Sequence, residues 1–97
     1  MSGIIRVTPA ELVGMSTRYR SESSQVGDQI NRLDNMIREL ESVWEGESSR
    51  AFSDQYQSLK PSIIQMQQLL EDISVQLNNT ARALEDADTQ IASQIRS

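Results

Sequence analysis

The sequence predicts an all-α protein, an antiparallel helix-turn-helix hairpin that dimerises into a four-helix bundle. The 97-residue chain is 4% aromatic and holds four glycines, which is typical of elongated helical proteins. Apolar residues recur at heptad spacing through two long segments. Because only a short break separates the segments, the two helices must fold back on each other, and residues 1–97 form a single hairpin domain.

The first helix is expected over residues 8–44. Thr8 is a good N-cap, and Pro9 suits the first helical position. Glu11 then falls at the capping-box position. These signals agree on where the helix begins.

A heptad seam of mainly apolar residues follows from that start. Ser16 and Ser23 interrupt its early half, which we expect to be more loosely packed for this reason. The later half is apolar, and we expect it to pack against another helix, either within the hairpin or in a dimer. Its members are Leu33, Ile37 and Leu40.

The second helix is expected over residues 49–93, after a turn at 45–48, with Ser48 as its N-cap. Pro61 lies inside the helical pattern, where proline removes a backbone hydrogen bond. We expect a kink near Pro61 because the seam keeps its phase there, and a second break at Lys60–Pro61 is the alternative. The seam residues on this helix are Phe52, Tyr56, Leu59, Ile63, Met66 and Leu70.

Further apolar residues beside the two seams widen each stripe to three rows, which suits a helix within a bundle. A lone two-helix hairpin leaves the third row exposed, whereas pairing two hairpins covers it. Leu40, Leu59 and Ile63 could each face its own copy. The sequence therefore predicts a homodimer.

The composition excludes several functional classes. The chain holds no cysteine and no histidine, so it has no disulfide, no cysteine or histidine zinc site and no Ser–His or Cys–His nucleophilic pair. The net charge of -5 leaves no basic surface for nucleic acid. We therefore expect no enzymatic activity, no cofactor, no metal and no nucleic-acid partner.

The N-terminus and the hydropathy bear on targeting. Residues 1–12 lack a basic segment followed by a long apolar core, so they are not expected to form a secretory signal peptide. No window approaches 18 uninterrupted apolar residues, so no membrane span is expected. Export, if it occurs, would need a route without a cleaved signal peptide.

The expected turn lies within the stretch SVWEGESS, residues 42–49. Gly46 can adopt the left-handed backbone that ends a helix. Trp44 is the single tryptophan of the chain. From the residues alone, an ordinary helix stop beside a core tryptophan is a sufficient account.

With Trp44, Glu45 and Gly46 at its midpoint, followed by SSRAFSDQYQSLKP and preceded near the N-terminus by RVTPAEL, the chain resembles the WXG-hundred (Trp-X-Gly, ESAT/EsxA-like) family. The resemblance covers the whole chain. It implies an antiparallel four-helix dimer that is cytoplasmic before export and is then secreted, without a cleaved signal peptide, by a type VII secretion system. It also implies recognition by the membrane-bound secretion ATPase, and other family proteins or larger effectors as co-exported partners.

In the family the export signal combines the Trp-X-Gly turn, here Trp44 and Gly46, with a helical C-terminal tail. The tail here departs from the common Tyr-X-X-X-Asp/Glu pattern, because no tyrosine follows Tyr56. A looser series of apolar, acidic, apolar and apolar residues is present on one helical face. It comprises Leu84, Asp88, Ile91 and Ile95. The same series would also suit an ordinary amphipathic helix end.

Two other functions compete with secretion. One is a purely intracellular helical-bundle adaptor. The other is a secreted effector that perturbs membranes, but the acidic composition gives no electrostatic attraction to anionic lipids.

Overall fold

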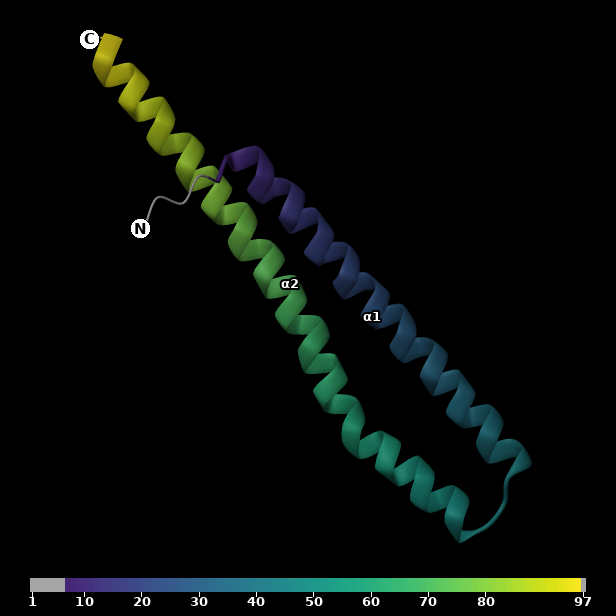
Figure 1. Ribbon diagram of the computed structural model, residues 1–97. Coiled ribbons are helices and arrows are strands. Elements are labelled where there is room, and N and C mark those ends of the chain that lie inside the picture. The colour runs from purple at the N-terminus through teal and green to yellow at the C-terminus, as the bar shows by residue number, and fades with distance from the viewer. Residues whose placement is uncertain (1–6, 97) are drawn as a thin grey trace, which may run out of the picture.

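The computed structural model describes residues 7–96 and consists of two helices, α1 (Pro9–Val43) and α2 (Glu47–Arg96). Figure 1 shows them side by side and antiparallel, joined by one short connection, in a molecule measuring 77 × 27 × 15 Å. No strand occurs among residues 7–96. The all-α hairpin is therefore confirmed. The signal-peptide prediction rests largely on residues 1–6, which lie outside the described residues.

The start of α1 follows the local sequence. Thr8 is the N-cap, and its Oγ1 accepts a hydrogen bond from the backbone N–H of Glu11 at 3.1 Å. Pro9 occupies the first turn, where its missing N–H removes no helical bond. The helix ends at Val43, next to the predicted end.

Helix α2 begins at Glu47, slightly earlier than expected, and runs past residue 93 to Arg96. Pro61 lies in its interior without ending it. Figure 1 shows α2 changing direction in its teal first part, while the helix itself continues. An interior proline produces this kind of bend because it removes one backbone bond and crowds the preceding turn.

In the half of the hairpin near the chain termini, serine side chains of one helix bind the backbone of the other. Ser16 and Ser74 form a reciprocal pair: each hydroxyl donates to the other residue's backbone oxygen, at 2.7 and 2.8 Å. Ser23 Oγ donates to the backbone oxygen of Gln67 at 3.1 Å. The expectation of loose packing at Ser16 and Ser23 was wrong. Both are buried, because a small hydroxyl lets the opposite backbone approach and then binds it.

The apolar core of the single chain is small. Only Ile30, Ile37 and Ala81 are buried hydrophobic residues in the part of the chain that the structure describes. Many larger apolar side chains remain exposed, several of them toward the turn. Among these are Met36, Val43, Phe52, Leu59 and Met66.

Helix α2 has 50 residues and α1 has 35, so the helices do not match in length. Figure 1 shows the yellow end of α2 extending beyond the start of α1. We call this segment the tail (residues 82–96), and within residues 7–96 no other helix continues alongside its far end. Its apolar residues Ile91 and Ile95 are therefore largely exposed.

Candidate functional site

At the turn, the chain leaves α1 in an extended conformation at Trp44 and enters α2 through Gly46. Trp44 is the C-cap, with φ -119° and ψ 101°, and its N–H donates to the backbone oxygen of Leu40 at 2.8 Å. The chain has thus left the helical conformation before it reaches Gly46. A tryptophan in extended backbone at this point projects from the helix end instead of continuing its stripe.

Gly46 belongs to the beginning of α2. Its φ is 123°, a conformation that favours glycine, and its backbone oxygen accepts from the N–H of Arg50 at 3.2 Å. The expected role of Gly46 as the residue that stops the first helix was wrong, because α1 ends at Val43 with Trp44 as its cap. Ser48 is not the N-cap either, since it lies inside α2.

Trp44 is partly exposed, at 38%, and packs against Phe52 on the next helix. The two ring centroids are 6.2 Å apart, with the planes tilted by 51°. This distance lies within the range of a favourable aromatic pair. The tryptophan is therefore anchored on one side and accessible on the other, as a side chain that contacts a partner must be.

The predicted tail residues lie on one face of the free end of α2. Leu84 is 38%, Ile91 55% and Ile95 80% exposed, and Asp88 is also exposed. Their spacing of four, three and four residues places them along one side of the helix. The tail thus presents an exposed apolar strip with one carboxylate beside it.

The structure does not bring the turn and the tail together within one chain. They lie at opposite ends of a hairpin whose long dimension is 77 Å (Figure 1). A surface made from both requires a second chain that runs antiparallel to the first.

The predicted seam divides between two faces of the hairpin. On α1, Ile37 is buried, and Leu33 and Leu40 are partly buried. On α2, one set of seam residues is partly buried toward α1, comprising Tyr56, Ile63 and Leu70. The other set is about half exposed, comprising Phe52, Leu59 and Met66.

Of these exposed residues, Phe52 and Leu59 belong to an apolar groove between the helices, close to the turn. We define it as the turn-side groove. Its lining residues are Leu33, Met36, Ile37, Leu40, Phe52, Gln55, Tyr56 and Leu59.

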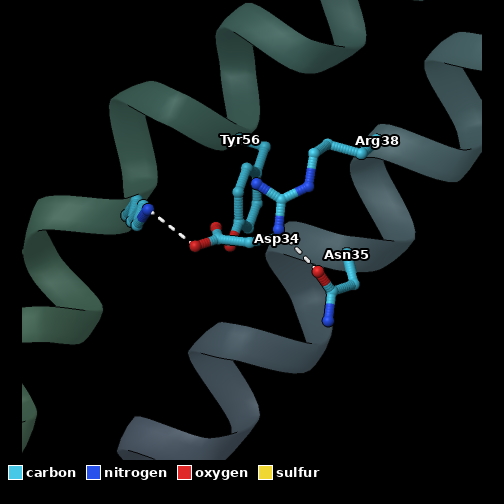
Figure 2. Close-up of polar contacts among 5 residues, drawn as sticks. Asp34, Asn35, Arg38 and Tyr56 are labelled. Carbon is cyan, nitrogen blue, oxygen red and sulfur yellow. Dashed lines mark hydrogen bonds and ion pairs between the residues drawn. The ribbon is translucent and has the colours of Figure 1, made fainter.

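A polar cluster that the sequence did not predict lies beside this groove and shares Tyr56 with it. Asp34 on α1 accepts hydrogen bonds from the Tyr56 hydroxyl at 2.6 Å and from Lys60 Nζ at 2.9 Å (Figure 2). These two bonds, Tyr56 first, hold the pKa of Asp34 below its usual 3.8. The carboxylate in turn raises the pKa of Tyr56 to about 12, with burial adding to the effect.

A signal for this cluster was available in the sequence. Asp34 falls four residues after Ile30 and three before Ile37, so it shares their inward face. Lys60 follows Tyr56 by four residues on the other helix. The spacing predicts that each group faces inward but does not predict which residues meet across the interface.

A sequence model of the family "Proteins of 100 residues with WXG" (WXG100) matches residues 4–89. The chain belongs to the WXG100 family. The Trp-X-Gly of the family description is Trp44–Glu45–Gly46, which the structure places at the turn. Ile91 and Ile95 of the tail lie beyond the residues that match.

Two relatives of this WXG100 chain are similar along nearly its whole length. Protein YukE of Bacillus subtilis (strain 168) is 54% identical over 96 residues, covering 99% of each chain. The type VII secretion system extracellular protein A of Staphylococcus aureus (strain USA300) is 34% identical over 89 residues, covering 92% of each.

The fold of this WXG100 chain also matches a crystal structure, that of Geobacillus thermodenitrificans EsxA (crystal form I). The TM-score is 0.85 at 51% identity, and the match covers 93% of this chain and 98% of that one. Within residues 7–96, neither helix combines the length and the hydropathy needed to cross a lipid bilayer.

Proposed function

We propose that this WXG100 protein is a non-enzymatic substrate of a type VII secretion system, exported as a homodimer. The observation that carries the proposal is the family match over residues 4–89, together with a relative that is named as an extracellular protein of such a system. No group of three or more acidic, histidine or cysteine side chains in residues 7–96 could hold a metal ion. The surfaces that stand out are those suited to contact other proteins.

The turn-side groove supports the homodimer. Met36 is 61% exposed and Leu59 is 55% exposed in the single chain. Leaving such apolar area in water is unfavourable, at about 25 cal/mol per Å². A second copy that runs antiparallel would cover the groove and would bring its own tail to the turn of the first. Light scattering at micromolar concentration should therefore give the mass of a dimer, and a stable monomer would contradict the proposal.

The turn and the tail together form the surface that we assign to the secretion ATPase. Trp44 is anchored by Phe52 yet partly exposed, and the tail presents Leu84, Asp88 and Ile91 on one face. An amphipathic helix with spaced apolar anchors is suited to binding in a groove on a receptor. Because the antiparallel dimer unites two elements that one chain keeps apart, the ATPase would recognise the dimer and not the separate chain.

The test of export is the appearance of the chain in culture medium of the host bacterium. We expect the chain at its full, unprocessed mass by mass spectrometry in the wild type, and none in a strain that lacks the secretion ATPase. A cytoplasmic protein should be absent from both media, which controls for lysis. Equal amounts in the two media would contradict the proposal.

Variants at the turn separate recognition from folding. Trp44→Ala should abolish export while helicity and dimer mass are retained, whereas Val43→Ala, at an 81% exposed neighbour, should export normally. Gly46→Ala is less informative, because its positive φ makes the substitution strained whatever contacts the turn. Normal export of the Trp44→Ala variant would remove the turn from the recognition surface.

Variants in the tail make the same comparison at the other end. Asp88→Asn should reduce export, because Asp88 lies beside the apolar strip. Asp86→Asn is the matched control, since this exposed carboxylate points away from that strip. If the two variants are exported to the same extent, the position of the Asp88 carboxylate does not matter for recognition, and this part of the proposal is wrong.

A further inference from the structure

A pocket lies at the turn beside Trp44, separate from the apolar turn-side groove. We call it the turn pocket. Residues from the last turn of α1, the connection and the first turns of α2 line it. Its lining residues are Glu41, Trp44, Glu45, Gly46, Ser49, Arg50, Ser53 and Asp54.

Ser49 is the unusual member of the turn pocket. It is only 6% exposed, and within residues 7–96 its hydroxyl forms no hydrogen bond. Ser53, on the same wall, instead donates to Glu41 Oε1 at 2.6 Å. No buried side-chain oxygen or nitrogen among residues 7–96 lacks a hydrogen-bond partner, so the Ser49 oxygen remains accessible to solvent although most of the residue is buried. Ser49 therefore offers a free donor and acceptor inside the pocket.

The charge of the turn pocket is also unbalanced. Glu41, Glu45 and Asp54 line it with Arg50 as the single cation. The ion pair found within residues 7–96 is Lys60 with Asp34, which lies outside the turn pocket. The three carboxylates thus have no cation in salt-bridge contact, and the pocket favours a positively charged ligand.

The third feature is the indole of Trp44, which lines the same pocket and is packed on Phe52. A cation over a tryptophan face is attracted by the ring quadrupole, and arginine is the cation most often found there. The guanidinium is planar and carries five N–H donors, so it can stack on a ring while its edge binds carboxylates. A lysine ammonium cannot do both equally well.

We propose that the turn pocket binds an arginine side chain from a neighbouring protein chain. The guanidinium stacks on Trp44, donates to the Ser49 hydroxyl oxygen, and pairs with the carboxylates of Glu45 and Asp54. The proposal deepens the proposed function and rests on it for the meaning of the contact, because it names the chemistry by which another chain recognises the turn. The binding itself is measured without any secretion assay.

The experiment is a fluorescence titration of the full chain, in which Trp44 is the single tryptophan. The probe is N-acetyl-arginine amide, and the matched control is N-acetyl-citrulline amide, which has the same shape without the charge. We expect a saturable change with arginine and about tenfold weaker binding of citrulline, because charge-assisted hydrogen bonds are the stronger ones. Equal responses to both probes would overturn the proposal.

Two matched pairs of variants locate the binding. Ser49→Ala should weaken arginine binding about fivefold, the usual effect of losing one hydrogen bond, whereas Ser48→Ala at the exposed neighbour should not change it. Glu45→Gln should weaken it, whereas Glu47→Gln, outside the turn pocket, should not. If each pair behaves alike, the probe binds elsewhere and the proposal is wrong.

The titration is repeated in an Arg82→Gln/Arg96→Gln variant, which removes both arginines of the tail. If a second copy supplies the natural arginine, the probe should bind this variant more tightly than the wild type. If another protein supplies it, the two should bind the probe equally. Absence of saturable binding in both backgrounds overturns the proposal even if export depends on the secretion ATPase. Loss of that dependence would instead count against the proposed function alone.

Discussion

The two halves of the hairpin are held together differently. Near the chain termini, Ser16 and Ser74 bind each other's backbone and are almost completely buried. Near the turn, the cross-helix hydrogen bonds are those of the part-exposed cluster around Asp34 and of Ser53 with Glu41, beside an open apolar groove. The first half satisfies its own polar groups within one chain. The second half leaves apolar surface uncovered and so depends on a partner.

This difference has a physical basis in side-chain size. Serine allows two helix backbones to approach closely, and the approach leaves no room for another chain between them. Phe52, Leu59 and Met36 are too large to be covered by one neighbouring helix and remain about half exposed. Substitutions should therefore affect folding in the first half and association in the second.

The largest effect is expected from Leu59→Glu in the turn-side groove. A carboxylate there would have to be buried in the dimer, so the dissociation constant should rise roughly 100-fold or more. Helicity by circular dichroism should remain, and sedimentation should give a monomer. Val75→Glu, at a similarly exposed apolar residue outside the groove, should remain dimeric. A dimeric Leu59→Glu variant would show that the groove is not the interface.

The second effect is overpacking at Ser74, which is 0% exposed. Ser74→Leu adds volume where the helices meet and removes the hydrogen bond that the Ser74 hydroxyl donates to Ser16, so the free energy of unfolding should fall by about 3 kcal/mol. Urea unfolding at fixed protein concentration measures it. The control Val75→Leu, at an exposed neighbour, should change stability little. A small effect at both positions would mean that the helices separate easily in this half.

A smaller effect is expected from Ser23→Ala, which removes the hydrogen bond to the Gln67 backbone. The loss should be about 1 kcal/mol, because alanine fills nearly the same space and only one bond disappears. Urea unfolding again measures it, with exposed Ser24→Ala as the control. A stabilised Ser23→Ala variant would support the original expectation that serine weakens this seam.

The sequence predicted those features that depend on neighbouring residues. The start of α1 follows from Thr8, Pro9 and Glu11, which lie within one turn of each other. The continuity of α2 through Pro61 follows from the apolar phase on both sides. Heptad spacing predicted the two helices because the period is a local property of each helix. The short break between them predicted the hairpin.

Features that depend on the register between the helices were not predictable. The sequence predicts loose packing at Ser16 and Ser23, because their neighbours in the sequence do not show that Ser74 and the Gln67 backbone lie opposite them. The role of Gly46 depended on α1 ending at Val43, a difference of a few residues at a helix end. The division of the α2 seam between two faces also depends on the register, because the register decides which side of α2 meets α1.

The smallest expected effect is the pH dependence of the Asp34 cluster, which is part-exposed. The folded pKa of Asp34 lies below 3.8, so its stabilising effect is complete above that value and is lost as the pH falls through the folded pKa. The folded pKa of Tyr56 is raised from 10.0 to about 12, so its effect is complete below pH 10 and is lost as the pH rises toward 12.

The difference in urea midpoint between the wild type and Asp34→Asn should therefore be constant at intermediate pH and shrink at both extremes. Tyr56→Phe should remove the alkaline decrease, because phenylalanine has no proton to lose. Asp28→Asn, at another exposed aspartate of α1, controls for the change in net charge. Parallel curves for the wild type and Asp34→Asn across the whole range would mean that the cluster does not couple the helices. The turn half of the hairpin would then depend on its partner chain alone.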